Sequence, residues 1–245
     1  MKLQSAFLSR AGGRKENEDY CACAEVNGHA CYLVADGLGA HRGGAIASKT
    51  VGESVISAFK SMPGASKGHL EKYLQYARQE LGKRETAERG IVSLKTTLVV
   101  LLSDCRSVIW AHIGDSRLYR FNIDSGKLVF RTRDHSVPQR LADSGEIASD
   151  QIRFHEDRNR LTAAFQSEGK SSFEYNADPK PLHRGDVFLL CSDGFWEYIF
   201  ESEMENTLCN ASTPESWLAA MEIRLLERAK SDHDNYSALA ILVGN

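Results

Sequence analysis

Five short acidic motifs, spread over the whole chain, hold the residues whose types and spacing could do chemistry. They read RKENED (14–19), VADGLGAH (34–41), HIGDSR (112–117), LCSDG (190–194) and HDNYS (233–237). Four of the five place an Asp where an apolar run ends or begins, and two contain an Asp-Gly pair. One such Asp is ordinary turn chemistry, but several carboxylates at the ends of buried strands suit hard divalent cations, which prefer oxygen ligands. The pattern therefore predicts a shared metal centre.

The elements that must position these acids are strands and amphipathic helices in alternating groups. Asn27-Gly28, between two short β-type runs, is a strong signal for a type I′ hairpin. Strands are predicted at 20–26, 30–35, 97–102, 108–113, 117–122, 127–131, 186–191 and 237–243, and helices at 44–62, 69–89 and 214–230. The polar stretch 136–160 is interpreted as a helix followed by a mobile insertion. Hairpin-linked strands in two groups, with helices between them, predict a layered α+β fold with mainly antiparallel sheets.

Composition limits the class of protein. A chain of 245 residues with 42% hydrophobic content can bury a sizeable core, and the absence of repeats and linkers favours one compact domain. A net charge of −3, without a dense Lys/Arg run, gives no reason to expect a nucleic-acid partner. No apolar run approaches the roughly 20 residues of a membrane helix, and the N-terminal apolar stretch is too short for a signal peptide. We therefore expect a cytoplasmic protein with no membrane partner.

The order of the motifs resembles that of the metal-dependent protein serine/threonine phosphatases of type 2C, the PPM family, in its bacterial single-domain form. R-x-x-x-E-D is followed by DG, GDSR, DHS, SDG and DN-x-[ST], so at least six motifs keep the family's order between Arg14 and Ser237. The resemblance implies a four-layer α-β-β-α sandwich of two mainly antiparallel sheets flanked by helices. It also implies that residues 1–245 are a single phosphatase catalytic domain with a flap insertion at about 136–160.

The resemblance implies a centre of two Mn²⁺ or Mg²⁺ ions, with a third, weaker ion beside it. Asp36 would bridge the two main ions, and the carbonyl oxygen of Gly37 would bind one of them. Asp193 and Asp234 would complete the ligands of the other. Asp115 matches a position that helps Asp193 hold the third ion in bacterial relatives. Oxygen ligands throughout suit Mg²⁺ or Mn²⁺, and the motifs offer no soft ligand for a structural zinc centre.

Three residues of the first motif would act beside these ions. Arg14 matches the family's phosphate-binding arginine, and a guanidinium fork suits a tetrahedral dianion. Glu18 and Asp19 would orient coordinated waters or touch a metal directly, with Asp19 the stronger candidate. Two metals lower the pKa of a shared water and clamp the phosphoryl oxygens. The family's reaction is thus direct attack by that water or hydroxide on the phosphate ester, with Arg14, Asp19 and Asp36 as the catalytic residues.

Departures from the family pattern concern the general acid. Animal members carry a His directly after the DG, where this chain has Leu38, which cannot donate a proton. His41 is a candidate for this role, and the alternative is a loop or helix-start residue. We interpret His112 as a buried, hydrogen-bonded residue and His135 as the donor or acceptor of a structural hydrogen bond. His233 is interpreted as the neighbour of a ligand rather than a ligand.

Three functions stay open on the sequence. The leading one is a protein serine/threonine phosphatase that acts on phosphorylated proteins and opposes a serine/threonine kinase in signalling. The alternatives are a non-catalytic pseudophosphatase that binds phosphoprotein or kinase partners, and a hydrolase for small phosphomonoesters. Retention of Asp36, Asp193 and Asp234 counts against the pseudophosphatase. We expect a monomer, and the stretch LCSDGFWEYI resembles a subgroup that controls type VI secretion.

Overall fold

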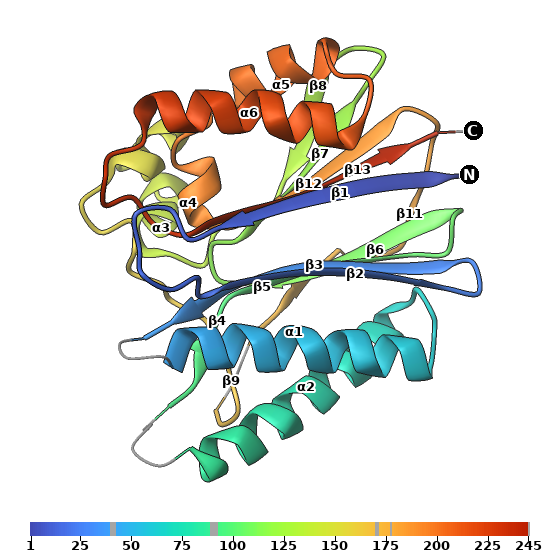
Figure 1. Cartoon of the computed structure of the whole chain (residues 1–245), viewed down its shortest axis with the longest axis vertical. Coiled ribbons are helices and arrows are strands. Elements are labelled where there is room, and N and C mark those ends of the chain that lie inside the picture. Colours follow the sequence, from blue (N-terminus) through green and yellow to red (C-terminus); the bar gives the residue numbers. More distant parts are fainter. Residues whose placement is uncertain (40–42, 89–92, 170–171, 177, 245) are drawn as a thin grey trace.

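Two β-sheets lie face to face between two pairs of helices (Figure 1). The computed structural model describes residues 1–39, 43–88, 93–169, 172–176 and 178–244. Helices α1 (Gly43–Ser61) and α2 (Lys67–Ala87) cover the outer face of one sheet, and α5 (Glu201–Cys209) and α6 (Pro214–Arg228) cover the other. Among the described residues, no helix is both long and apolar enough to span a membrane. The predicted α-β-β-α sandwich is confirmed.

Both sheets are antiparallel throughout. The first sheet contains, in spatial order, β1 (Leu3–Arg10), β13 (Tyr236–Val243), β12 (Asp186–Cys191), β7 (Arg117–Asn122) and β8 (Lys127–Arg131). The second contains β10 (Glu174–Tyr175), β6 (Ser107–Ile113), β5 (Leu98–Ser103), β3 (His29–Leu38), β4 (Lys95–Thr96) and β9 (Phe165–Gln166), with β2 (Asp19–Val26) paired to β3 and β11 (Lys180–Pro181) to β6. Every strand pair among the described residues is antiparallel.

The side-chain alternation of β3 divides the core into layers. Successive residues of a strand point to opposite faces of the sheet. One face of β3 packs against α1 and α2 through Cys31, Leu33 and Ala35. The other face packs between the two sheets through Ala30, Tyr32 and Val34. Because both faces are covered, the strand reads as a continuous apolar run, as is usual for strands buried on both sides.

The predicted boundaries agree best where an apolar run is short and sharply flanked. The ranges predicted for β7, β8 and β12 are the observed ones, and the three predicted helices are confirmed with ends shifted by a few residues. The strand β1 was not predicted, because LQSAFLSR mixes polar and apolar residues at the edge of a sheet. The helix α5 was also missed, because ESEMENTLC buries only Met204 and Leu208.

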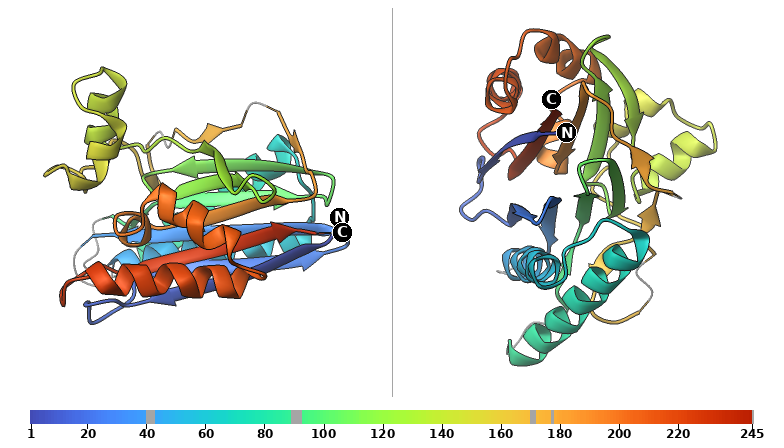
Figure 2. Two further views of the ribbon diagram at one scale, coloured as in Figure 1. Left: turned by 90° about the horizontal axis from the view of Figure 1, so that it is seen from above. Right: turned by 90° about the vertical axis from the view of Figure 1, so that its right-hand side faces the viewer.

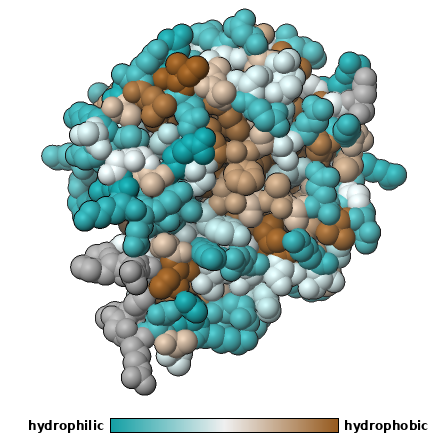
Figure 3. Space-filling model, viewed as in Figure 1, coloured by the Kyte–Doolittle hydropathy of each residue, from teal (hydrophilic) through white to brown (hydrophobic). Residues whose placement is uncertain are grey.

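The first and last strands of the chain are neighbours. β1 pairs with β13 along its whole length, from Leu3 opposite Val243 to Arg10 opposite Tyr236. The two termini accordingly lie side by side in Figure 1. Phe7 of the edge strand β1 points outward and is exposed, and Figure 3 shows apolar residues gathered in the middle of this face of the molecule. The first sheet is therefore complete only when both ends of the chain have joined it.

The polar stretch 136–160 folds into two short helices that project from one end of the sandwich (Figure 2, left). The predicted helix is α3 (Val137–Asp143), and a 3₁₀ helix, η1 (Ser149–Phe154), follows it. The buried Arg153 donates hydrogen bonds of 2.5 Å and 3.0 Å to the carbonyl oxygens of Trp196 and Ile199. This segment is therefore attached to the chain that follows β12, next to the SDG motif.

Candidate active site

The acidic motifs meet at one end of the sandwich. Asp36 lies near the end of β3, directly opposite Asp19 at the start of β2. Asp193 opens the single-turn helix α4 (Asp193–Trp196) after β12, and Asp234 lies just before β13. Asp115 lies in the turn between β6 and β7. Since antiparallel neighbours begin and end at the same edge, acids far apart in the sequence become neighbours in space.

Asp36, Asp115 and Asp193 form a group of carboxylates in which Asp115 is buried and the other two are partly buried. Ligand oxygens of the three side chains lie within 4.8 Å of one another. Burial, and then the charge of Asp193, raise the pKa of Asp36 and of Asp115 well above the usual value of a carboxyl group. Burial, and then the charge of Asp234, also raise the pKa of Asp193. Like charges in a dry site disfavour ionisation, so this group fits a cation that compensates them.

Asp19 supplies a further carboxylate to the same site. Its Oδ2 accepts a hydrogen bond of 2.7 Å from the Ser192 hydroxyl. Its Oδ1 is buried and has no hydrogen-bond partner among the described residues. Burial above all raises the pKa of Asp19 to about 7. A buried polar atom without a partner is rare in folded proteins. The open oxygen, with the neighbouring carboxylates, therefore fits the all-oxygen ligand set of Mn²⁺ or Mg²⁺.

Two glycines allow the metal-site loops to approach their neighbours. A Cβ atom at Gly37 would lie 2.1 Å from the carbonyl oxygen of Gly44. A Cβ atom at Gly194 would lie 2.1 Å from the carbonyl oxygen of Asn235. No side chain fits at either position without moving backbone. Each Asp-Gly pair thus places its acid against a second segment of the chain.

Two threonines fix the backbone of Asp36. The Asp36 N–H donates to the Thr97 hydroxyl at 2.9 Å. In return, the Asp36 carbonyl oxygen accepts hydrogen bonds of 2.7 Å from the Thr96 hydroxyl and 2.8 Å from the Thr97 N–H. Because both backbone groups of Asp36 are bound, its carboxylate is held toward the other acids.

Asn235 holds the first motif in place, a role that sequence reasoning missed. Its side-chain amide donates to the carbonyl oxygens of Ala11 and Glu16 at 2.8 Å and 2.9 Å. Its side-chain oxygen accepts a hydrogen bond of 2.8 Å from the N–H of Glu18. The signal in the sequence was an Asn directly after the motif acid Asp234, but its partners lie more than 200 residues away. Asn235 therefore positions residues 14–19 from the other end of the chain.

Arg14 and Asp234 form an ion pair at the rim of the site. Arg14 Nε donates to Asp234 Oδ1 at 3.1 Å, and Arg14 Nη2 donates to Oδ2 at 3.0 Å. The side chains are 54% and 45% exposed, so Asp234 lies outside the buried carboxylate group. Burial, followed by the charge of Asp234, raises the pKa of Glu18, which lies beside them. The arginine fork is thus held next to the acids but open to solvent.

A buried ion pair lies behind the carboxylate group. Arg117 donates to Asp134 through Nε at 2.8 Å and Nη2 at 2.7 Å, and both side chains are only 1% exposed. The Arg117 guanidinium stacks 3.3 Å from the centre of the Trp196 ring. The indole N–H of Trp196 in turn donates to the Asp115 carbonyl oxygen at 3.0 Å. The pair and the tryptophan together position the backbone of Asp115.

The histidines of the motifs take different places. As predicted, His135 makes a hydrogen bond, because its Nδ1 accepts from the Gly114 N–H at 3.2 Å. His112 is buried as predicted, but only its Nε2 is hydrogen bonded, to the Arg133 carbonyl oxygen at 2.7 Å. His41 lies outside the described residues. Leu38 is the last residue of β3, and the general acid stays unassigned.

Comparison with known proteins gives one family. A family model described as protein phosphatase 2C matches residues 9–234. A serine/threonine phosphatase, stp, of Listeria innocua is 33% identical over 186 residues, which cover 74% of this chain and 72% of that protein. The motif order and the match therefore agree over most of the chain.

Solved structures agree with the sequence relatives. The structure of PppA, a key regulatory component of T6SS in Pseudomonas aeruginosa, has a TM-score of 0.80 at 29% identity and covers 99% of this chain and 98% of that one. The catalytic domain of the serine/threonine protein phosphatase PstP, in complex with two manganese ions, has a TM-score of 0.80 at 25% identity and covers 99% of both chains.

Proposed function

The chain belongs to the protein phosphatase 2C family, and on that premise we propose how its residues hydrolyse phosphoserine and phosphothreonine. It is a metal-dependent phosphoprotein phosphatase with Mn²⁺ or Mg²⁺ as cofactor. The observation that carries the mechanism is the close group of the Asp36, Asp115 and Asp193 carboxylates. The unpartnered oxygen of Asp19 lies beside that group.

The proposed assignment gives each acid a metal-binding role. Asp36 and the carbonyl oxygen of Gly37, together with Asp193 and Asp234, would hold the two main ions. Asp115 and Asp193 would hold a third, weaker one. When bound, the two ions supply a nucleophilic water at neutral pH and neutralise charge on the phosphoryl oxygens. The raised pKa values of Asp36, Asp115 and Asp193 support this assignment, because a cation is what such a group lacks.

The chain's own residues bind the phosphate and orient the water. The Arg14 side chain pairs with Asp234 and is 54% exposed. Its guanidinium group can therefore also bind a phosphate dianion at the same rim. Asp19, with one oxygen fixed by Ser192, keeps the other free to accept a hydrogen bond from water. Glu18, beside Asp19, helps to orient the coordinated water. Leu38 has no proton to give, so protonation of the leaving group is not assigned to the position after the Asp-Gly pair.

The proposed substrates are phosphorylated proteins, and the proposed role is to oppose a serine/threonine kinase. We further propose that 1–245 is a single catalytic domain in which residues 136–160 are a flap that selects substrates. Arg158 of this flap pairs with Glu197 at 2.9 Å, one helical turn beyond Asp193. Loops that lie on a rigid scaffold beside a site often determine specificity. The flap is therefore placed to contact the protein chain that carries the phosphate.

The test compares Asp193→Asn with the wild-type enzyme on phosphoserine, phosphothreonine and phosphotyrosine peptides, and on free phosphoserine. Metal charge stabilisation of several kcal/mol corresponds to a rate loss of at least about a thousandfold. We expect that loss in Asp193→Asn, and in the wild type after chelation. The exposed Asp178→Asn is the matched control and should keep full activity. Turnover that survives chelation, or an active Asp193→Asn enzyme, would refute the mechanism. If the enzyme hydrolysed free phosphoserine as fast as the phosphopeptides, the proposal that its substrates are proteins would be refuted.

A further inference from the structure

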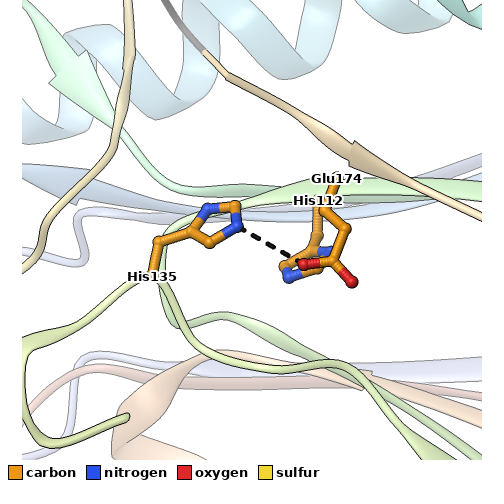
Figure 4. Close-up of side chains that lie close together, drawn as sticks. All are labelled: His112, His135 and Glu174. Atoms are coloured by element: carbon orange, nitrogen blue, oxygen red, sulfur yellow. Dashed lines mark ion pairs between the residues drawn. The ribbon is translucent and has the colours of Figure 1, made fainter. Parts of the chain in front are cut away.

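A second group of metal-ligating side chains lies outside the carboxylate site (Figure 4). His112 on β6 lies directly opposite Glu174 on β10 in the sheet. His135, in the segment after β8, reaches the same place, and Figure 4 shows its ring facing the Glu174 carboxylate. One ligand atom from each of the three residues lies within 4.8 Å of the other two. Three different segments of the chain thus bring two imidazoles and one carboxylate together.

His112, a member of this group, has a buried ring nitrogen without a hydrogen-bond partner among the described residues. Its Nε2 lies 2.7 Å from the Arg133 carbonyl oxygen. A carbonyl accepts only, so Nε2 carries the proton and the neutral ring has its lone pair on Nδ1. The residue is 1% exposed, and Nδ1 has no hydrogen-bond partner among the described residues. Metal-binding histidines are typically oriented in this way, with the second ring nitrogen donating to a carbonyl or carboxylate.

His135 and Glu174 complete the group from its open side. His135 Nε2 lies 3.7 Å from Glu174 Oε2, which is too long for a direct hydrogen bond. Burial and the neighbouring His112 lower the pKa of His135, which favours the neutral form of the ring that a metal requires. The Glu174 side chain is 53% exposed, so an ion can enter past it.

We propose that His112, His135 and Glu174 form a second cation site, selective for a borderline-soft divalent metal such as Zn²⁺. Two imidazoles and one Glu, with one position left open, are a known ligand set of zinc. Imidazole suits zinc, whereas the all-oxygen catalytic site suits Mn²⁺ and Mg²⁺. The two sites therefore differ in their ligand atoms, and each prefers a different kind of metal ion.

Binding requires a local rearrangement. The rings of His112 and His135 are stacked, with centroids 4.9 Å apart and an angle of 18° between their planes. A metal lies in the plane of each imidazole it binds, so one ion cannot serve both rings while they are stacked. His135 is partly exposed and can turn, which gives up the 3.2 Å contact between its Nδ1 and the Gly114 N–H. Gly114 precedes Asp115, so zinc binding alters a contact next to the catalytic acids.

The test is zinc binding to full-length protein in which Asp36→Asn and Asp193→Asn have weakened the catalytic site. We expect one Zn²⁺ per chain by calorimetry. Adding Glu174→Gln should weaken zinc binding at least about tenfold, since even outer-shell changes at metal sites cost 10–100-fold. Glu215→Gln, an exposed change at the start of α6, is the matched control and should leave zinc binding unchanged. Glu174→Gln in the otherwise native enzyme should keep its Mn²⁺-dependent activity.

Co²⁺ and NMR provide independent measurements. Co²⁺ should give the visible spectrum of a site with nitrogen and oxygen ligands, and Zn²⁺ should shift the ring signals of His112 and His135. Equal zinc affinity with and without Glu174→Gln would overturn the proposal. A cobalt–thiolate absorption band would also overturn it, because the ion would then be bound by cysteine.

Discussion

Two buried acid environments lie side by side in this protein and differ in one respect. Asp134 is buried with its own counterion, because Arg117 binds both of its oxygens. Asp36, Asp115 and Asp193 lie together, with Asp115 buried and the other two partly buried, and none of them has such an ion pair within the described part of the chain. The GDSR motif contributes to both, since Asp115 faces the carboxylates and Arg117, two residues later, faces Asp134. A buried carboxylate with an internal partner stabilises the fold, whereas carboxylates grouped without one fit a cation from solution.

The largest effect on stability should come from breaking the internal pair. Arg117→Met leaves the Asp134 charge buried and unpaired, which costs about 3–5 kcal/mol in the free energy of unfolding. Arg120→Met on the same strand is the matched control, because Arg120 also binds an acid, Asp186, but is 16% rather than 1% exposed. Urea denaturation of both variants measures the difference. Equal losses would show that burial of the Arg117 pair has no special consequence.

A smaller effect should come from supplying the missing cation. A ligand at 100 times its Kd stabilises the folded state by about 2.7 kcal/mol. For a domain of this size, that raises the melting temperature by about 5–10 °C. The measurement is thermal unfolding with Mn²⁺, with and without chelator, and Asp193→Asn is the control that should lose the gain. If adding Mn²⁺ did not change the melting temperature, the carboxylate group would need no cation from solution.

The smallest effect should come from removing one charge from the carboxylate group. The pKa of Asp115 is raised in the folded protein, so its ionised form opposes folding near pH 7. Asp115→Asn should therefore stabilise the metal-free protein, by about 1 kcal/mol if the change has the usual size of a single-residue effect. Asp134→Asn should do the reverse, because it leaves Arg117 without its partner. Urea denaturation in chelator compares the two, and a destabilised Asp115→Asn would contradict the comparison.

The carboxylate group could be predicted from the sequence because its acids follow apolar strands. Asp36 and Asp193 each end a run whose burial is evident from composition, and antiparallel pairing brings such ends together. The internal pair could not be predicted. Arg117 and Asp134 are 17 residues apart. Their contact depends on the path of the segment after β8, which brings Asp134 next to the start of β7. Spacing along the chain carries no information on which of the available acids that arginine meets.

The same limit applies to the fold. Strands buried on both faces, such as β12, were predicted with the right bounds because five apolar residues follow Asp186 without interruption. The edge strand β1 was missed, because its pairing with β13 depends on a partner at the other end of the chain. The amide of Asn235 was missed for the same reason. Local patterns determine elements, whereas the contacts that complete the site are long-range.

The long sequence separation between Asn235 and its hydrogen-bond partners has a consequence for protein synthesis. Its three hydrogen bonds to residues 11, 16 and 18 form only after translation has passed residue 235 and β13 can join β1. Until then, residues 11, 16 and 18 lack these three hydrogen bonds, and the acid at 234 has not yet been made. We therefore expect phosphatase activity only after β13 has been synthesised and has joined β1, even when the first helices have already folded.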